Sequence, residues 1–436
     1  MPESVRYGAL EIMVVDQFHQ AWWDKGSGAD RYGSFHNPNI NLILWMQGWR
    51  FVGTVGKNNW GDISGTRATI LVRGVDAADA MVKAPTGWER IWHDKDTDSL
   101  EYGSVWRPQA PSGYVALGDV WTEGWGEPDD GYAYGCIRKE LAGRPYVREG
   151  ETGDLIWNDK GSEGSYDVSC WEIRPAGYPD NTERLILGAD LLRAHDGYDR
   201  PVDKVHVLDL PPVIVKREPP AAPVLTSHQA PKETDQVTDR AVLVPCTVIK
   251  DPGKTVAWQV TNSPFYTLER RLSFHPHKHF DNSQGSTEES APQTVTTGVS
   301  KTKSDEFSER TSITVTAHAG IELKGFSAGI ETSVATELGY TSRREVSQFE
   351  EVTDTWPLTI PAGKSAAIWS PRHELVAVRS NGDAVGGQGG LVFDVNSRIK
   401  TEYPAPAQEP GSLSEAIEAG DSAPFGKHES NVPAGL

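Results

Sequence analysis

The sequence contains little cysteine and no long hydrophobic run. Only three cysteines occur in 436 residues, namely Cys136, Cys170 and Cys246. They lack metal-ligand spacing, so we expect no metal site and mostly reduced thiols, with a Cys136–Cys170 disulfide as the alternative. Apolar runs such as residues 40–46 are far shorter than the ~20 residues that a membrane-spanning helix requires. The N-terminus has neither a basic start nor a long apolar stretch, so we expect no secretory signal there.

Basic residues are fewer than acidic residues, and two sequence motifs of common enzymes are absent. The 42 Lys and Arg residues face 61 Asp and Glu, which gives a net charge of -19. Nucleic-acid binding needs a basic surface, so this balance argues against it. No phosphate-binding glycine loop or H-E-x-x-H occurs. We therefore expect neither enzymatic activity nor a cofactor.

Residues that favour turns and strands are abundant. The chain has 43 glycines, 29 prolines and 15 tryptophans. This composition favours a turn-rich protein of the all-β class.

One short pattern occurs three times in the first half of the chain. W-x-D-K is found at Trp22–Lys25, Trp92–Lys95 and Trp157–Lys160. A serine follows ten positions after each aspartate, at Ser34, Ser104 and Ser169. A repeat of this length can hold one small antiparallel sheet, and three sheets can bury their inner faces against one another. We predict a three-repeat β-prism-like domain over residues 1–210 that binds a target surface.

The repeated tryptophans and aspartates allow several interpretations. The aspartates could bond the backbone of their own turns, and the tryptophans could lie in the core. Alternatively, both could contact a surface ligand such as a glycan or a lipid headgroup. The alternating carboxylates of residues 94–101 also permit a calcium loop. The candidate surface-ligand contacts are Trp22, Asp24, Trp92, Asp94, Trp157 and Asp159.

Two of the repeats carry a family resemblance. "GSVWRPQAPSGYVALGDV" (103–120) and "IWNDKGSEGSYDVSCWEIRPAGY" (156–178) resemble the vacuolar protein sorting protein 62 family over roughly residues 85–195. The first repeat departs from that pattern, with His36 and Asn37 in place of the Trp-Arg pair. The resemblance implies a fold more than a function.

The second half begins with a proline-rich segment, 211–235, which we predict to be a linker. Beyond it, "FHPHKHF" (274–280) places three histidines on one face of a strand. They could be exposed on an edge strand, sense pH or bind a metal. The tail 405–436 is acidic and rich in proline, alanine and glycine, and we expect a loose extension or a removable propeptide.

Strict alternation of apolar and polar residues marks the segment 312–340. We predict two strands joined by a turn at Lys324–Gly325, in a register that pairs Ala319 with Ile330. The apolar face, which we expect to contact lipid, consists of Ile313, Val315, Ala317, Ala319, Ile321, Leu323, Phe326, Ala328, Ile330, Val334 and Leu338. The charged residues of the polar face, which would line a lumen, are His318, Glu322, Glu331 and Glu337.

This segment suits either a membrane hairpin or an ordinary half-buried hairpin. Its apolar stretches match the ~9–11 residues with which a tilted strand crosses a bilayer. A single hairpin would leave its edges unpaired in hydrocarbon, so several copies would have to close a barrel.

Residues 238–404, including "WPLTIPAGKSAAIWSPRHELVAV" (356–378), resemble the aerolysin-type β-pore-forming toxins, in particular the epsilon-toxin and mosquitocidal-toxin group. The resemblance implies an elongated pore-forming domain over 236–404 with long strands flanking the hairpin. It also implies a soluble monomer, an unknown glycan or protein receptor, a homo-oligomeric ring and insertion into the target-cell membrane. We therefore expect a pore-forming toxin, with insects among the candidate targets. The alternative is a non-lytic, lectin-like or trafficking protein.

Overall fold

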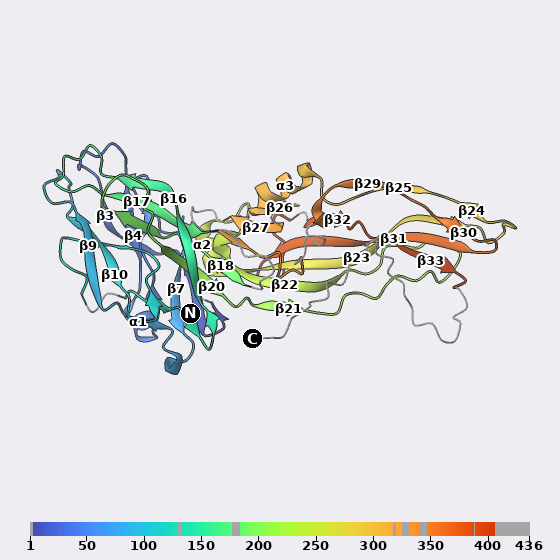
Figure 1. Ribbon diagram of the computed structural model, residues 1–436, viewed down its shortest axis with the longest axis horizontal. Helices are drawn as coiled ribbons and strands as arrows, with labels where there is room; N and C mark the ends of the chain where they lie inside the picture. The colour runs from blue at the N-terminus through green and yellow to red at the C-terminus, as the bar shows by residue number, and fades with distance from the viewer. Residues whose placement is uncertain are drawn as a thin grey trace, which may run out of the picture.

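The computed structural model describes residues 3–129, 133–176, 184–316, 320–324, 331–340, 347–387 and 389–405. The molecule is elongated, with a broad N-terminal lobe (the N lobe, residues 3–210) and a long, narrow C-terminal lobe (the C lobe, residues 211–405) (Figure 1). Antiparallel strands dominate both lobes, which confirms the predicted all-β class. The tail 406–436 lies outside the described residues.

Three sheets of the N lobe have equivalent strand orders, one for each sequence repeat. In each sheet the W-x-D-K strand pairs with the strand that carries the repeated serine, as predicted. A register shift precedes the tryptophan in all three first strands, so even the β-bulge is repeated. The sheets are β3(Phe18–Trp23)-β4(Ser34–Pro38)-β6(Val55–Lys57), β9(Gly87–His93)-β10(Gly103–Gln109)-β12(Val120–Glu123) and β16(Val147–Asn158)-β17(Ser169–Pro175)-β19(Leu192–His195), the last extended by β20(Val205–Leu210) and β18(Leu185–Leu187).

The described part of the N lobe also contains three smaller sheets. They are β1(Ser4–Tyr7)-β2(Leu10–Val15)-β7(Thr69–Gly74)-β5(Arg50–Phe51), β11(Tyr114–Val115)-β13(Cys136–Arg138)-β8(Val82–Lys83) and β14(Glu140–Leu141)-β15(Arg144–Pro145). The helices among the described residues of this lobe are α1(Leu42–Met46) and the 3-10 turn η1(Ala77–Asp79). All three cysteines of the chain are buried free thiols, as expected from their spacing.

The C lobe is organised along two very long neighbouring strands, β23(Phe265–Asp281) and β31(Ser365–Val378) (Figure 1). Their sheet is completed by β21(Ile214–Lys216), β22(Val237–Pro245), β32(Leu391–Asp394) and β33(Ile399–Tyr403). Two short ladders pair β24(Glu289–Ser290) with β30(Thr359–Ile360) and β25(Gln293–Thr297) with β29(Val352–Trp356). The remaining elements are η2(Cys246–Val248), α2(Val256–Asn262), α3(Lys301–Thr311), β26(Ile313–Thr316), β27(Gly320–Lys324), β28(Glu331–Ser333) and η3(Ser347–Phe349). No helix among the described residues is long and apolar enough to cross a membrane.

The proline-rich segment 211–235 is extended and lies against the long sheet. Part of it forms β21, which pairs with β22. Further along, Leu225 is buried with Phe274 and Trp369. The Thr234 amide then donates to the Phe274 carbonyl at 3.1 Å.

The two lobes share one continuous hydrophobic cluster at their junction. Its members include Tyr7 and Leu208 of the N lobe and Val244 and Val334 of the C lobe. The Tyr7 hydroxyl also donates to the Leu243 carbonyl at 3.2 Å. Burial at this junction stabilises the two lobes against each other.

Candidate functional site

The three repeated tryptophans meet at the centre of the N lobe. Trp22 and Trp157 are completely buried and Trp92 is 2% exposed. Their rings pack edge to face, with centroids 5.3 Å apart for Trp22–Trp157, 5.5 Å for Trp22–Trp92 and 6.0 Å for Trp92–Trp157. Such edge-to-face pairs add stability beyond the area they bury. The repeats thus build a shared aromatic core.

Hydrogen bonds connect the three repeats in a closed cycle. The Trp22 indole donates to Asp94 Oδ2 of the second repeat at 2.8 Å. The Trp92 indole donates to the Tyr166 carbonyl of the third repeat, also at 2.8 Å. The Trp157 indole donates to Asp24 Oδ2 of the first repeat at 3.2 Å. Each repeat therefore satisfies a buried donor of its neighbour, which fixes the three sheets relative to one another.

Two of the three repeated aspartates also bond their own turns, as the turn interpretation predicts. Asp24 Oδ1 accepts from the Gly33 amide and Asp159 Oδ1 from the Val168 amide, both at 2.9 Å. Asp94 accepts from two indoles, those of Trp22 and Trp125. Burial raises the pKa of Asp24 and Asp159 above the ordinary value, and these backbone bonds oppose the increase.

The structure places the six candidate surface contacts in the interior of the N lobe. Each of the six is at most 3% exposed and their polar atoms bond the chain itself, so a surface-ligand contact by any of them stays a prediction. The residues concerned are Trp22, Asp24, Trp92, Asp94, Trp157 and Asp159.

A second set of aromatic residues surrounds the buried aspartates and is exposed. Trp60, Trp125 and Tyr198 follow the third strand of each sheet and are 38%, 37% and 37% exposed. A tyrosine lies beside two of them, with ring centroids 4.4 Å apart for Tyr32–Trp60 and 4.9 Å for Tyr102–Trp125. We call this set the aromatic rim, which comprises Tyr32, Trp60, Tyr102, Trp125, Tyr166 and Tyr198. The sequence interpretation missed the rim because Trp60, Trp125 and Tyr198 stand at different distances after the repeated serine, namely 26, 21 and 29 residues.

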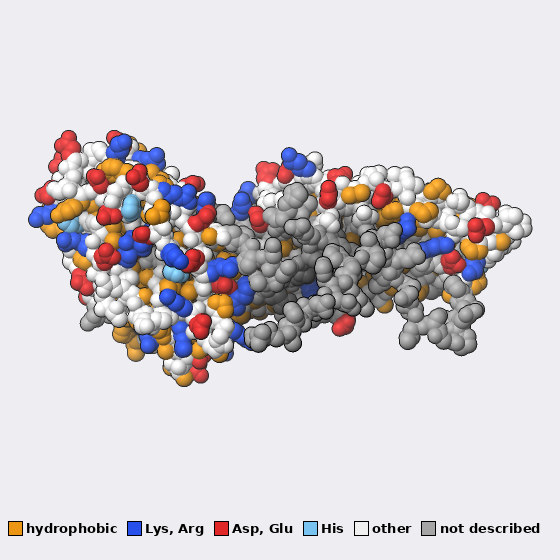
Figure 2. Space-filling model, viewed as in Figure 1, with side chains coloured by type: hydrophobic (Ala, Val, Ile, Leu, Met, Phe, Trp, Pro, Cys, Tyr) orange, Lys and Arg blue, Asp and Glu red, His pale blue; other side chains and the backbone are white. Residues whose placement is uncertain are grey.

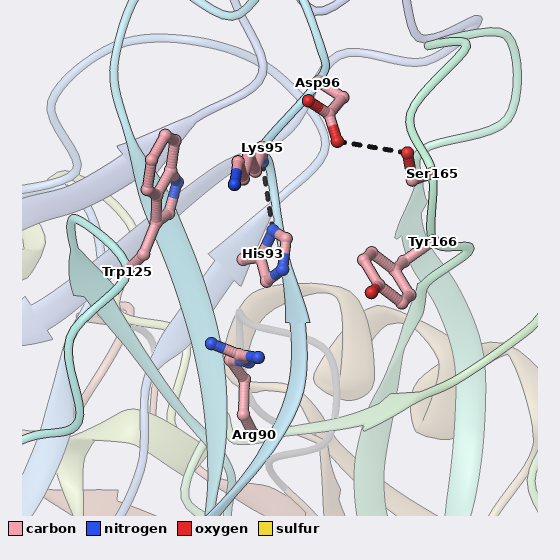
Figure 3. Close-up of a pocket in the computed structure, with 7 residues that line it drawn as sticks. All are labelled: Arg90, His93, Lys95, Asp96, Trp125, Ser165 and Tyr166. Carbon is pink, nitrogen blue, oxygen red and sulfur yellow. Dashed lines mark hydrogen bonds between the residues drawn. The ribbon is translucent and has the colours of Figure 1, made fainter.

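A cavity of about 380 Å³ opens in this rim between the second and third repeats. Figure 3 shows Trp125 on one side, Tyr166 on the other and the basic residues of β9 and its following turn between them. His93 lies between the two aromatic walls, with centroids 5.0 Å from Tyr166 and 6.3 Å from Trp125. The cavity is lined by Arg90, His93, Lys95, Asp96, Trp125, Ser165 and Tyr166.

One hydrogen bond determines which ring nitrogen of His93 carries the hydrogen. The Lys95 amide donates to His93 Nδ1 at 3.2 Å, so that nitrogen acts as the acceptor and Nε2 carries the hydrogen. Burial, together with the Arg90 charge, lowers the pKa of His93 below the ordinary value. Burial thus favours the neutral imidazole, which can donate one hydrogen bond from Nε2.

The cavity is basic on an acidic protein. Arg90 and Lys95 contribute two cations, while the single carboxylate, Asp96, accepts from the Ser165 hydroxyl at 3.1 Å. Aromatic faces suit the apolar face of a sugar ring, and cations with directed donors suit a carboxylate or sulfate. This combination can bind an acidic saccharide.

The alternating segment of the C lobe adopts a different register from the predicted hairpin. Ile313 pairs with Leu323 and Val315 with Ile321, so β26 and β27 form a short hairpin within the stretch predicted to be one strand. Leu323 also pairs with Thr332 of β28, rather than with Phe326 across a Lys324–Gly325 turn. Apolar strand faces must be covered in a folded chain, and these short strands pack against α3 and the N lobe.

Helix α3 covers this three-stranded sheet, although strands were expected to flank the hairpin there. The Ser304 hydroxyl donates to the Val315 carbonyl at 2.8 Å, and Ser308 and Thr314 share a hydrogen bond at 3.0 Å. The described residues of the predicted lipid face are all at most 4% exposed: Ile313, Val315, Ile321, Leu323, Val334 and Leu338.

Of the predicted lumen residues, Glu322 is half-buried and Glu337 is buried, while Glu331 pairs with Lys324 through the backbone. Seven of the candidate residues of the predicted hairpin lie outside the described residues, namely Ala317, His318, Ala319, Gly325, Phe326, Ala328 and Ile330. Whether the predicted lipid and lumen faces form in a membrane stays a prediction.

The end of this segment is attached to the long sheet. The Tyr340 hydroxyl and His373 Nδ1 share a hydrogen bond at 2.8 Å, and both residues are buried. The Arg270 guanidinium lies over the Tyr340 ring, 5.2 Å from its centroid, and also pairs with the buried Asp239. Burial lowers the pKa of His373 to about 3, so this bond forms with a neutral imidazole.

Two histidines of the "FHPHKHF" motif form a small charged cluster. Among the described residues, His275, His277 and Asp394 are the one group close enough together to hold a metal ion. Arg372 already pairs with Asp394 at 2.7 Å and with Glu233 at 2.7 Å. Asp394 and Glu233 therefore already have a cationic partner within the protein, namely Arg372.

Comparisons with known proteins divide the chain at the same place. Residues 2–205 match the family model described as vacuolar protein sorting-associated protein 62, which confirms the resemblance seen in the repeats. Residues 241–361 match the model described as Insecticidal Crystal Toxin, P42, whereas the aerolysin-type resemblance stays a prediction. No curated protein matches the chain.

The solved structures that match this chain include GNIP1Aa and Cry35Ab1. GNIP1Aa from Chromobacterium piscinae is 24% identical, with a TM-score of 0.36, over 45% of this chain. The chain spans only 37% of the length of GNIP1Aa. Cry35Ab1 is 11% identical, with a TM-score of 0.33, over 92% of this chain and 91% of its own.

Proposed function

We propose that this protein is an insecticidal, pore-forming toxin whose N lobe binds the target cell and whose C lobe inserts into its membrane. One observation carries the proposal. The range that matches the insecticidal crystal toxin family, 241–361, contains the alternating segment 313–338. The segment most suited to a barrel wall thus falls within the toxin-like part of the chain.

Target binding is assigned to the aromatic rim and its basic cavity. Trp125 and Tyr166 would hold the face of a sugar ring, while Arg90 and Lys95 would pair with its acidic group. A glycan-bearing receptor is therefore the proposed first partner. Binding many glycans on one cell surface would concentrate the protein there.

Insertion would exchange one apolar environment for another. The apolar residues of β26 and β27, and Val334 after β28, are now buried under α3 and against the N lobe. On insertion they would face lipid, and neighbouring copies would pair their strand edges to close a barrel. The second proposed partner is thus further copies of this chain, in a ring.

Dye release tests both steps together. We expect the purified protein to release dye from vesicles prepared from insect gut membranes, with rings visible by electron microscopy. The Lys95→Ala variant should bind these vesicles at least about tenfold more weakly, because it removes a cation from the cavity. Lys25→Ala is the matched control, since Lys25 occupies the same position in the first repeat but does not line the cavity.

The alternative function is a non-lytic, glycan-binding protein, which the cavity alone would also support. Binding to the vesicles with neither dye release nor rings would favour that alternative and contradict the toxin. Equal binding by the Lys95→Ala variant and the parent would remove the cavity from the proposal.

A further inference from the structure

Helix α1 carries the most exposed cluster of large hydrophobic side chains on the N lobe. Leu42, Ile43 and Met46 are 69%, 66% and 73% exposed, and Trp45 is 39% exposed. Figure 2 shows hydrophobic side chains gathered along the lower edge of this lobe, where Figure 1 labels α1. We call these four residues the apolar knuckle. Exposed apolar residues in such a cluster mark an interaction site.

The fold holds this knuckle in place from beneath. Asn41 caps the helix, with its side chain accepting from the Leu44 amide at 3.0 Å. Ile40 and Leu44 pack against the core cluster that contains Trp49. Since these two residues face inward, the other apolar residues of the helix must face outward.

The segment that carries the knuckle has no charged side chain of its own. No charged residue occurs between Arg31 and Arg50 in the sequence. The Arg50 guanidinium lies over the Trp45 ring, 5.5 Å from its centroid, and donates to the Trp45 carbonyl at 3.0 Å. Arg50 has no ion pair with any carboxylate in the described part of the chain, so its charge is available to a phosphate.

We propose that the apolar knuckle docks on a lipid bilayer, with its aliphatic side chains among the acyl chains and Arg50 beside the lipid phosphates. A tryptophan between an aliphatic tip and a cation is suited to the membrane interface. A protein partner fits less well. The four side chains expose about 500 Å², whereas a stable interface buries about 800 Å² from each partner. This contact goes beyond the proposed receptor binding, because it requires neither a glycan nor insertion.

Flotation with protein-free vesicles of phosphatidylcholine and phosphatidylserine tests the contact. The full-length protein should float with the vesicles, and Leu42→Ser/Ile43→Ser should reduce its partition at least about tenfold. Leu100→Ser is the matched control, because Leu100 is equally exposed, at 69%, but lies between β9 and β10. These vesicles carry no glycan, so failure of the cavity proposal would leave the result unchanged.

A fluorescent label locates the contact directly. In Met46→Cys the new thiol is exposed while the three native thiols are buried, so a polarity-sensitive dye labels position 46 alone. Its emission should shift to the blue on addition of vesicles. Unchanged emission, or equal flotation of the parent and Leu42→Ser/Ile43→Ser, would overturn the proposal. The proposal would also be overturned if the parent binds no vesicles but forms a dimer that the double serine variant does not form. That result would assign the knuckle to contact with a second copy of the chain.

Discussion

A disulfide between β26 and β27 should hold the C lobe in its soluble form. Thr314 and Glu322 lie directly opposite each other in this hairpin, and both side chains are half-buried. Opposite residues have Cα atoms about 4.5–5.5 Å apart, within the range of a disulfide. In the continuous strand expected after insertion, the same two residues would be about 26 Å apart, eight steps of about 3.3 Å. A cross-linked chain therefore cannot form that strand.

Dye release from insect gut membrane vesicles provides the assay. Oxidised Thr314→Cys/Glu322→Cys should release dye only at background level, and reduction should restore release. Each single cysteine variant serves as a control, and Glu322→Cys also controls for the lost carboxylate. The native thiols are buried and should not interfere. Full release by the oxidised double variant, with the cross-link confirmed by mass spectrometry, would refute the proposed rearrangement.

Two further predictions concern stability. Gly103→Ala should lower the free energy of unfolding by about 1–3 kcal/mol, because the new Cβ would lie 2.2 Å from Trp22 Cδ1. Gly126→Ala, with no atom within 4 Å of its Cβ, should be neutral, and a denaturant titration that finds the two variants equal would contradict the packing. Burial lowers the pKa of His373 to about 3 in the folded chain, whereas the pKa of a histidine in the unfolded chain is about 6.5. As the pH falls, the unfolded chain therefore takes up the proton before the folded chain does. The contribution of His373 to stability is complete above pH 6.5 and decreases as pH falls toward 3, by about 2 kcal/mol between pH 7 and pH 5. His373→Gln should flatten that dependence while keeping a hydrogen-bonding side chain near Tyr340, and an unchanged slope would show that other groups cause it.

The three-sheet arrangement could be predicted because its signals are local. Each repeat places a tryptophan, a turn and a returning serine within about a dozen residues, and alternation gives the strand faces. The functional surface could not be predicted in the same way. The cavity depends on His93, whose equivalents are Trp23 and Asn158, and on Tyr166 of the adjacent repeat. Only the packing of two different repeats brings such residues together.

The alternating segment shows a different limit of sequence reasoning. Alternation identifies the apolar residues but not the strand that each one pairs with. In the soluble form these residues must be covered by protein, and α3 supplies that cover. The Ser300 side chain accepts from the Lys303 amide at its start, and Ser312 ends it in the left-handed region at φ 61°. An arginine at Val334 would disrupt this core as well as a barrel wall, so it cannot isolate insertion.

The central claim is that the protein opens an ion-conducting pore. Current across a planar bilayer made with lipid and receptor from insect gut membranes measures this directly. We predict discrete upward steps that prefer cations, because the polar face of the alternating segment carries glutamates. A membrane that binds the protein and shows no current steps, at concentrations that injure the cells, would contradict the account.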